Sequence, residues 1–343
     1  MCSGDDDAIS ERNVPASTTR PPAQILTDLT NAHVVTRCLH VLADFGVADA
    51  LDEEPATAAE LAARTGMNTD ALERMLRLVA AHDVFAAQGK RYAHTPASRL
   101  LRSDHPQSLR PLVRMRALPA MWNGLTELAH AARTGQPVRD WASLMSYFAA
   151  HPDEAAIFDA AMVAKSLRVV PTVVDAYDFS RFAIVADIGG GRGHLLQGIL
   201  ERNPQTSGVL FDVPRVIANA TAVATPRLRL TAGDFFVDAL PTADAYVLMD
   251  LLHDWSDADA TRILGAVRRA APTQARVLIV ETLVGEQPGP HFGKTLDIIM
   301  LAVTGGRERT PSEHGALLTA AGFRLQRVLP TASQYSVVEA VGT

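Results

Sequence analysis

Asp187-Ile-Gly-Gly-Gly-Arg-Gly193 lies between an apolar run at 183–186 and a segment whose apolar residues recur at helical spacing. This pattern predicts a glycine-rich turn from a strand into a helix, where glycine lets the backbone bend sharply and approach a ligand closely. The alternation of strands and helices continues downstream and is typical of a doubly wound parallel sheet. The further apolar runs of strand length are 208–211, 245–251 and 277–280.

Two more signals mark the C-terminal half. Ser256 is suited to cap a helix over 257–270, which has acidic residues in its first turn and basic residues in its last. The runs 324–329 and 335–341 are separated by only a short turn, so they should pair in antiparallel fashion.

The composition favours small-molecule chemistry. A chain of 343 residues exceeds what one core usually organises, so we expect a large domain together with a smaller one. Apolar residues make up 48% and charged residues 20%, which is ordinary globular usage. The formal net charge of -6 gives no broad attraction to nucleic acid or to an anionic membrane surface, so we expect neither partner.

Cysteine usage and the N-terminus favour a cytoplasmic protein. Only Cys2 and Cys38 are present, so we expect neither a disulfide framework nor a cysteine-built zinc site. Residues 1–20 include an acidic run and lack the pattern of a signal peptide, which predicts a disordered tail. No apolar stretch approaches the roughly twenty residues needed to cross a bilayer.

The segment 25–45 predicts a helix with apolar residues on more than one side. Such a helix needs burial on two sides. It is either internal or packed against a second copy of the chain, and we favour the second copy because the helix adjoins the predicted tail.

A helix-turn-helix with a short wing is predicted at 57–92. Thr57 and Glu60 match a capping box, and Thr65-Gly66 marks the turn between two helices. Gly89-Lys90 then separates two short strand-like runs, as in a hairpin. The combination is typical of a winged-helix domain.

A winged helix raises the alternative of a DNA-binding regulator. Between residues 57 and 85, however, four acidic residues outnumber three basic ones. A helix that faces phosphates needs more positive charge than this. We therefore interpret 21–110 as a dimerisation domain. Residues 111–174 form a helical segment whose aromatic side chains either line a substrate pocket or simply fill a core.

The glycine spacing indicates which ligand the turn binds. Gly189, Gly191 and Gly193 read Gly-x-Gly-x-Gly, whereas the nicotinamide fingerprint is Gly-x-Gly-x-x-Gly. Asp187, directly before them, would repel a pyrophosphate and attract a cation. S-adenosylmethionine carries a sulfonium and an ammonium group, so it fits better than a dinucleotide.

Acids at the ends of the next strands extend the predicted cofactor site. Asp212 closes the second strand, where a carboxylate can accept both hydroxyls of a ribose. Gly233, Asp234 and Phe235 follow the third strand and offer an acid to the adenine amine and an aromatic ring to its face. Each acid alone could be a solvated loop residue or a cap. Their recurrence at successive strand ends favours the cofactor.

These features resemble the S-adenosylmethionine-dependent O-methyltransferases of the plant caffeate and flavonoid type and their bacterial natural-product relatives. The resemblance runs from Leu26 to the C-terminus. It implies a winged-helix dimerisation domain, a homodimer, and a Rossmann-like methyltransferase domain at 175–343 with a mostly parallel seven-stranded sheet. Its motifs are Asp187-Ile-Gly-Gly-Gly, Leu210-Phe-Asp-Val-Pro214, Gly233-Asp-Phe-Phe236, Leu252-His-Asp-Trp-Ser-Asp257 and Gly305-Gly-Arg-Glu-Arg-Thr310.

The resemblance implies a general base at His253, bracketed by Glu281 and Glu308. A phenol is only about one part in a thousand ionised at pH 7, so a base that takes its proton during attack accelerates the reaction by about a hundredfold to ten-thousandfold. A carboxylate on the other ring nitrogen fixes the tautomer and stabilises the imidazolium. A lone histidine would instead be interpreted as a cap or core residue. Base catalysis replaces what a metal would supply, so we expect no metal cofactor.

Substrate contacts are implied in the same way. Phe158 and Met162 lie four residues apart on one helical face and match positions that line the family's pocket; without the resemblance they would be interpreted as core. Asp254, beside the base, is interpreted as a ligand contact or a helix cap. Many relatives have a lysine four residues before the base, where this chain has Met249, so a charged contact to the cofactor is lost there.

The sequence therefore predicts transfer of a methyl group from S-adenosylmethionine to a phenolic or enolic hydroxyl of a small-molecule secondary metabolite. An enzyme of the same fold that catalyses decarboxylation or hydroxylation is an alternative. The retention of all three implied catalytic residues argues against it.

Overall fold

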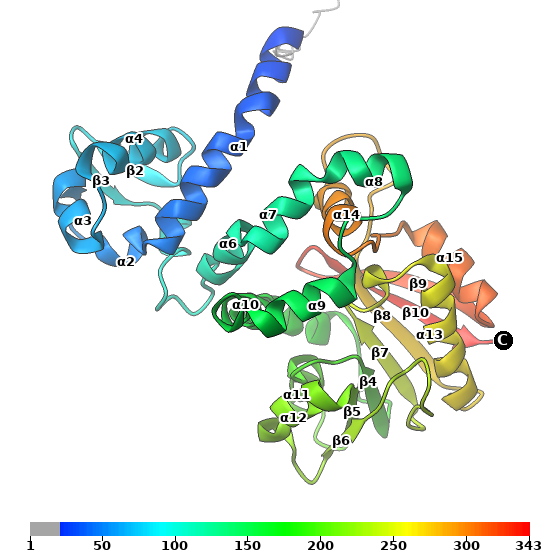
Figure 1. The fold of residues 1–343 in the computed structure, drawn as a ribbon. Helices are drawn as coiled ribbons and strands as arrows, with labels where there is room; N and C mark the ends of the chain where they lie inside the picture. Colours follow the sequence, from blue (N-terminus) through cyan, green and yellow to red (C-terminus); the bar gives the residue numbers. More distant parts are fainter. Residues whose placement is uncertain (1–20) are drawn as a thin grey trace, which may run out of the picture.

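The computed structural model describes residues 21–343, and the tail predicted for residues 1–20 lies outside the described part. Figure 1 shows a small N-terminal unit, a set of helices beside it, and a C-terminal α/β unit. Within the described range, no helix combines the length and the apolar character needed to span a membrane.

The N-terminal unit has a helix-turn-helix and a three-stranded antiparallel sheet of order β1-β3-β2, as the winged-helix pattern predicts. The capping box is confirmed: Thr57 Oγ1 accepts the Glu60 N–H at 3.2 Å, and Glu60 Oε2 accepts the Thr57 N–H at 2.6 Å. The elements are α1 (Pro22–Asp44), α2 (Val47–Ala50), β1 (Ala56–Thr57), α3 (Ala58–Thr65), α4 (Thr69–Ala80), β2 (Phe85–Gln88), β3 (Arg91–His94) and α5 (Pro96–Arg99).

Basic residues of this unit are occupied by neighbouring acids. Arg64 pairs with Asp52 at 2.7 Å, and Arg91 pairs with Glu60 at 3.3 Å. Guanidinium groups held in this way are less available to phosphates, in line with the interpretation of the unit as a packing module.

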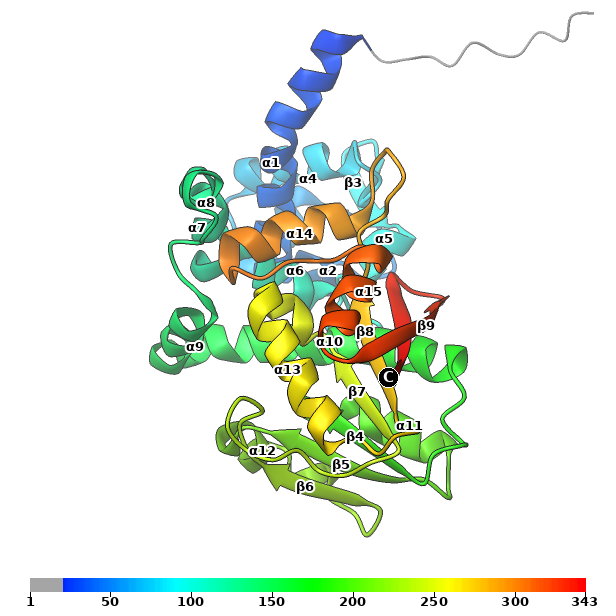
Figure 2. The same cartoon turned by 90° about the vertical axis from the view of Figure 1, so that its right-hand side faces the viewer.

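Five helices connect the two units and form their own apolar cluster. They are α6 (Arg110–Ala117), α7 (Pro119–Thr126), α8 (Leu128–Thr134), α9 (Trp141–Ala150) and α10 (Pro152–Ala176). Ala302 and Val303 of α14 (Phe292–Val303) complete this cluster, and a Cβ on Gly124 of α7 would overlap the Ala302 carbonyl oxygen. Figure 2 shows α14 crossing beside these helices. A late segment of the chain thus packs against the helices predicted to line the pocket.

The C-terminal unit confirms the predicted fold class. Its seven strands have the order β6-β5-β4-β7-β8-β10-β9, with β10 antiparallel to both neighbours. Ser256 caps α13 as predicted, since its Oγ accepts the Asp259 N–H at 3.2 Å. The elements are β4 (Ile184–Ile188), α11 (His194–Arg202), β5 (Ser207–Asp212), α12 (Pro214–Asn219), η1 (Thr221–Val223), β6 (Leu228–Ala232), β7 (Ala245–Met249), η2 (Leu252–Asp254), α13 (Asp257–Ala270), β8 (Arg276–Thr282), α14, α15 (Pro311–Ala320), β9 (Phe323–Pro330) and β10 (Tyr335–Gly342).

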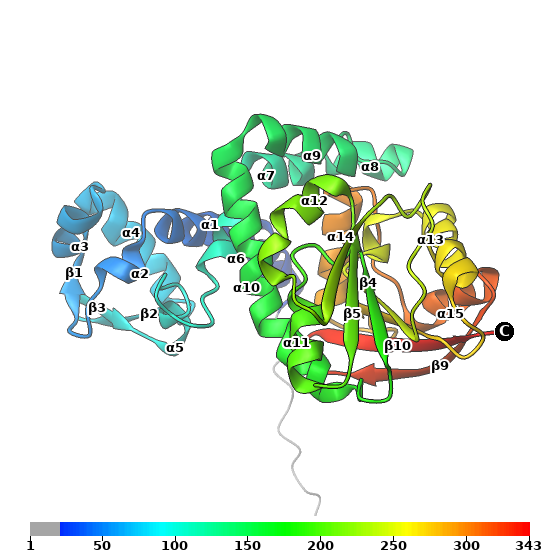
Figure 3. The same ribbon diagram turned by 90° about the horizontal axis from the view of Figure 1, so that it is seen from below.

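Helices cover both faces of this sheet. One core cluster joins the sheet to α13 and α15, and a second joins it to α10 and α11. Figure 3 shows α10 between the N-terminal helices and the sheet. The chain runs outward from β4 to β6 and then returns to β7 beside β4. In such sheets ligands bind at the carboxyl ends of the strands near this reversal, which is where the predicted site residues lie.

The N-terminal half of α1 exposes apolar side chains. Leu26 is 68% exposed and Leu29 is 69% exposed, and Ile25 and Val34 are exposed as well. Exposed apolar side chains gathered on one helix mark an interaction surface. Residues 21–343 leave this surface uncovered, which favours the second of the two alternatives for this helix, packing against a second copy of the chain.

We expect the double substitution Leu26→Glu and Leu29→Glu to convert a dimer to a monomer, because it places charge where apolar contact is needed. The melting temperature of the chain should change little, since both side chains are exposed. Light scattering coupled to size-exclusion chromatography measures the change. Thr27→Glu with Asn31→Glu adds equal charge to exposed polar positions of α1 and should leave the dimer intact. If both double variants had the same molar mass, Leu26 and Leu29 would not form the dimer contact.

Candidate active site

The glycine-rich turn after β4 has the backbone conformation that the sequence requires. Gly189 and Gly191 have φ angles of +67° and +60°, which side chains other than glycine rarely adopt. A Cβ on Gly189 would also contact the Leu251 side chain at 2.8 Å, whereas a Cβ on Gly191 would enter open space. The turn therefore keeps an unfilled volume on one side.

Asp187 ends in a buried position beneath this turn. It is 1% exposed, and its Oδ1 has no hydrogen-bond partner among the described residues. Burial, together with the charge of Asp212, raises the pKa of Asp187 to about 7. A bound cation would satisfy this carboxyl and favour its ionised form. The site thus fits the predicted sulfonium and ammonium groups.

Asp212 holds the turn through main-chain amides. Its Oδ2 accepts the Gly191 N–H at 2.9 Å, and its Oδ1 accepts the Val213 N–H at 2.7 Å. Each carboxylate oxygen keeps a second lone pair, so the side chain remains able to accept ribose hydroxyls. Burial raises the pKa of Asp212, while these two amides oppose that shift.

Asp234 contributes to its own loop. Its Oδ1 accepts the Phe236 N–H at 2.8 Å, which is the loop-building role left open by the sequence. Gly233, before it, packs on the Phe211 ring, where a Cβ would approach within 2.7 Å. The Phe235 ring lies edge-on to Phe236, with ring centroids 4.8 Å apart. The loop therefore presents an aromatic ring beside the end of β6.

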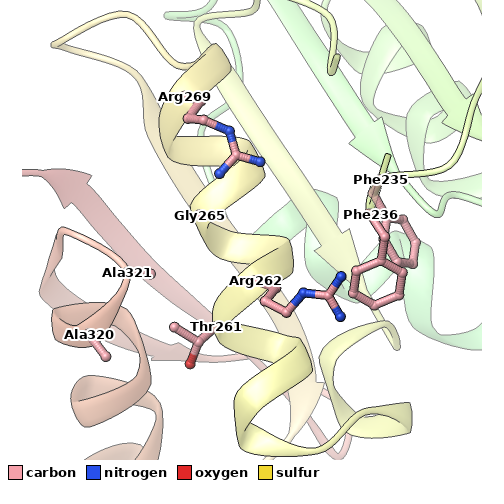
Figure 4. A pocket seen from close by; sticks show the side chains of 8 residues that line it. All are labelled: Phe235, Phe236, Thr261, Arg262, Gly265, Arg269, Ala320 and Ala321. Carbon is pink, nitrogen blue, oxygen red and sulfur yellow. The ribbon is translucent and has the colours of Figure 1, made fainter. Parts of the chain in front are cut away.

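A cavity of about 370 Å³ borders the same loop but lies apart from the predicted base. Figure 4 shows Phe236 with the Arg262 guanidinium above it, 4.6 Å from the ring centroid. His253, Glu281 and Glu308 are not among the residues that line this cavity. We therefore locate the candidate catalytic centre from the ionisable side chains at the ends of β7 and β8, and not from this cavity.

His253 lies in η2, directly after β7, and is 7% exposed. Glu308 Oε1 accepts the imidazole Nδ1–H at 2.7 Å, which leaves Nε2 as the free base position. Glu281 Oε1 instead accepts the main-chain N–H of His253 at 3.0 Å. This differs from the expectation that two acids bracket the ring: Glu308 orients the imidazole, and Glu281 anchors the backbone that carries it.

The segment that carries Glu308 is locked onto the loop that carries His253. Arg309 is 1% exposed and donates to the carbonyl oxygens of Leu252 and Trp255, each at 2.9 Å. The Arg307 N–H donates to the His253 carbonyl oxygen at 2.8 Å. Both charged and main-chain contacts thus fix the distance between the base and its carboxylate.

The electrostatics of this cluster favour a protonated imidazole in the free protein. Burial lowers the pKa of His253, but the charge of Asp254, the hydrogen bond to Glu308 and the charge of Asp250 together raise it to about 10. Asp254 Oδ1 lies 3.8 Å from His253 Nε2. Burial raises the pKa of Asp254 to about 6, and its carboxylate has no hydrogen bond to any residue between 21 and 343. Asp254 is therefore open to a ligand.

The sequence did not single out three side chains that join this cluster. Asp250, with a φ of +49°, forms an ion pair with Lys165 at 2.9 Å and accepts the Tyr335 hydroxyl at 3.1 Å. Lys165 of α10 thus brings a positive charge from another part of the chain to Asp250, the residue that follows Met249. Only Asp250 had a sequence signal, as an acid placed directly after a buried strand.

Phe158 and Met162 lie on α10 and pack against the apolar cluster of the connecting helices. The Phe158 ring lies 4.8 Å from that of Phe148. Both side chains are half-buried, so packing and substrate contact are compatible, and their role as substrate contacts stays a prediction. No group of three or more potential metal ligands is gathered anywhere in residues 21–343.

Comparison with known proteins identifies the family. Residues 125–324 match the O-methyltransferase domain, and residues 27–104 match the O-methyltransferase dimerisation domain. The chain is 40% identical to a phenazine O-methyltransferase of Lysobacter antibioticus, over 93% of this chain and 96% of the relative. It is 38% identical to the 8-amino-8-demethylriboflavin N,N-dimethyltransferase of Streptomyces davaonensis, over 89% and 91%.

A solved structure agrees with this relationship. The methyltransferase of calicheamicin biosynthesis, in its S-adenosylhomocysteine-bound form, superimposes with a TM-score of 0.86 at 36% identity. The match covers 94% of this chain and 98% of the other. The chain belongs to the S-adenosylmethionine-dependent O-methyltransferases, which confirms the family resemblance and the predicted cofactor.

We expect Gly306→Ala to destabilise the protein by about 1–3 kcal/mol or more, because a Cβ there would overlap the His253 carbonyl oxygen and force the two loops apart. Thermal unfolding measures the loss. Gly265→Ala is the matched control, since a Cβ at this helical position meets only the Arg269 guanidinium at 3.6 Å. It should stabilise the protein by up to about 1 kcal/mol. Equal effects of the two substitutions would contradict the proposed steric lock.

The charge of His253 predicts how stability depends on pH. Its pKa is about 10 in the folded chain and about 6.5 in an unfolded one, so the folded chain binds more protons between these values. Stability from this group is fully present below pH 6.5 and is lost as the pH rises toward 10. We expect urea unfolding to show this decline, and His253→Asn to flatten it. If the free energy of unfolding fell with pH equally in the wild type and in His253→Asn, the imidazole would not be the cause of the decline.

Proposed function

We propose that the protein transfers a methyl group from S-adenosylmethionine to a phenolic or enolic hydroxyl of a small-molecule secondary metabolite, with His253 as general base. The observation that carries the proposal is the 2.7 Å hydrogen bond between His253 Nδ1 and Glu308, which leaves Nε2 free in a buried site. The base lies next to the ends of the strands whose loops fit the cofactor.

The residues proposed to hold the cofactor come from three neighbouring strand ends. Asp187 offers a buried carboxyl to its positive charges, Asp212 offers lone pairs to its ribose, and Phe235 offers a ring to its adenine. When bound, S-adenosylmethionine supplies an electrophilic methyl group on a positively charged sulfur. The protein contributes alignment, because an in-line displacement requires the acceptor oxygen to be held opposite the departing sulfur.

His253 is proposed to accept one proton during the reaction. Its neutral Nε2 accepts the proton of the acceptor hydroxyl, and Glu308 stabilises the imidazolium that forms. The main-chain hydrogen bond to Glu281 keeps the imidazole from drifting away from the acceptor. The raised pKa of His253 favours the imidazolium, with both ring nitrogens protonated, in the free protein at neutral pH. The methyl-transfer rate should therefore rise with pH as the imidazole becomes neutral.

The acceptor is proposed to be a small aromatic molecule. The carboxylate of Asp254 lies beside the base and makes no hydrogen bond to a described residue, so it can accept a hydrogen bond from a ligand. Phe158 and Met162 would cover the ring of such a ligand. The phenazine O-methyltransferase among the relatives supports this substrate class.

An amine is the second candidate nucleophile, because one relative is named as an N,N-dimethyltransferase. A neutral amine attacks through its own lone pair and needs no base before the displacement. The imidazole oriented by Glu308 therefore has more to contribute to a hydroxyl, which is why we favour O-methylation.

The protein is further proposed to act as a homodimer, supported by the dimerisation domain and the exposed apolar residues of α1. We place the enzyme in the cytoplasm on the strength of its sparse cysteine content. The division into a dimerisation domain at 21–110, a pocket segment at 111–174 and a methyltransferase domain at 175–343 remains part of the proposal.

We expect His253→Ala to lower kcat by about a hundredfold to ten-thousandfold, because the hydroxyl proton then has no positioned acceptor. Calorimetry should show unchanged affinity for S-adenosylhomocysteine. His130→Ala, at an exposed position of α8, is the matched control and should retain full turnover. Turnover of His253→Ala at the wild-type rate would remove the base assignment.

Mass analysis of the product separates methylation from the alternative reactions. A phenazine with a free hydroxyl, chosen for the relative named above, serves as the first acceptor to try. We expect the product to gain one methyl group and one equivalent of S-adenosylhomocysteine to be released. Loss of carbon dioxide or gain of oxygen without that release would overturn the proposal in favour of a non-methylating activity.

A further inference from the structure

One oxygen of Glu281 has no role in the site as described. Oε1 accepts the main-chain N–H of His253, whereas Oε2 has no hydrogen-bond partner among the described residues. The side chain is completely buried, so bulk solvent does not reach it. Buried polar atoms in folded proteins are nearly always paired, and an exception calls for an explanation.

The imidazole of His314 faces this oxygen. His314 lies on α15 and is completely buried, its Nε2 is 3.6 Å from Glu281 Oε2, and neither ring nitrogen has a hydrogen-bond partner in the described chain. Two buried groups without hydrogen-bond partners thus face each other at a distance only slightly longer than a hydrogen bond. A single proton placed in this gap satisfies both atoms.

Three arrangements place a proton there: a carboxylic acid that donates to a neutral imidazole, a carboxylate that accepts the N–H of a neutral imidazole, or a carboxylate that accepts from an imidazolium. Complete burial disfavours the two arrangements that keep a carboxylate. Burial is the main cause that raises the pKa of Glu281 to about 7; the charge of His253 opposes this shift and the charge of Glu308 adds to it. Burial, together with the charge of Arg309, lowers the pKa of His314 to about 4. Burial therefore favours the neutral pair, whereas the neighbouring charges act in both directions.

We propose that Glu281 is a carboxylic acid in the working enzyme and donates its Oε2–H to Nε2 of His314, which makes His314 a positioning residue of the active site. The inference rests on the function proposed above, since it concerns the same base. The two acids then differ in role: neutral Glu281 anchors the backbone of His253, and ionised Glu308 stabilises its ring.

The neutral state matters for the base. A further carboxylate against His253 would make its proton harder to release, and the His253 pKa is already raised to about 10 by Asp254, Glu308 and Asp250. A proton held between Glu281 and His314 avoids that extra charge. The other charged or titratable groups facing the pair are His253, Asp250, Glu308, Arg309 and Tyr335 around Glu281, and Arg309, Glu313 and Asp257 around His314.

Infrared difference spectroscopy of the full-length protein tests this state directly, because a carboxylic acid has a carbonyl stretch that a carboxylate lacks. The spectrum is recorded below the Glu281 pKa of about 7 and compared with that of Glu281→Gln. We expect the difference to contain one acid band. His314→Leu should shift that band to higher frequency, since the acid loses its acceptor, and His314→Gln should restore most of the wild-type position.

Asp187→Asn is the matched control for this measurement. Asp187 is the other buried acid whose pKa is raised to about 7, and it lies under the glycine-rich turn. Its band should be insensitive to His314→Leu. Absence of an acid band from Glu281, or a Glu281 band that ignores both His314 substitutions, would overturn the proposal. Should His314→Leu fail to fold, His314→Met, which also removes the ring nitrogen, takes its place and should give the same shift to higher frequency.

Kinetics provide an independent test. Glu281→Gln mimics the neutral acid, so we expect less than about a tenfold loss in kcat and no movement of the acidic limb of the pH profile. Glu308→Gln removes a working carboxylate and should lose about a hundredfold or more. A limb that moves to lower pH in Glu281→Gln would show that Glu281 is ionised and would overturn the proposal.

The infrared measurement needs neither acceptor nor cofactor, so it also separates two kinds of failure. If the wild-type protein had no measurable affinity for S-adenosylhomocysteine, the proposed function would be refuted. The infrared band of Glu281 would still test the pairing of Glu281 with His314. Normal cofactor affinity and turnover with no Glu281 acid band would refute only the pairing with His314.

Discussion

The active site depends on the contact between the loop 252–257 and the segment 305–310. Buried Arg309 binds main-chain carbonyls of the first loop, and Gly306 lets the two backbones touch where any side chain would collide. This contact sets the 2.7 Å separation between His253 and Glu308. A base and its carboxylate on different elements keep a fixed geometry only when the backbones that carry them are joined in this way.

The second constraint is charge. His253 lies among the carboxyl groups of Asp250, Asp254 and Glu308, with Lys165 as a nearby cation. Such a cluster tolerates burial only because each charge has a partner or is neutralised by a proton. It also suits a positively charged cofactor, whose binding adds to a site where negative charge predominates. The same imbalance raises the proton affinity of the base, which makes the protonation state of Glu281 relevant to the chemistry.

The pocket is built from parts of the chain that are distant in sequence. The connecting helices carry Phe158 and Met162, whereas α14, more than a hundred residues later, completes their apolar cluster. Lys165 reaches Asp250 from α10 in the same way. The α/β unit therefore supplies the cofactor loops and the base, and helices from both halves of the chain enclose the acceptor. Variation in those helices can change the acceptor without disturbing the base.

Local rules were enough to predict many elements. The Thr57 capping box, the Ser256 cap and the final antiparallel pair depend on residues close together in sequence, and all are found. Motifs likewise identified the glycine turn and the family. The sequence did not reveal that Glu281 binds the backbone of His253, that His314 faces Glu281, or that Lys165 pairs with Asp250. Those contacts follow from how helices pack on the sheet, and packing angles depend on the whole core, which no local pattern encodes.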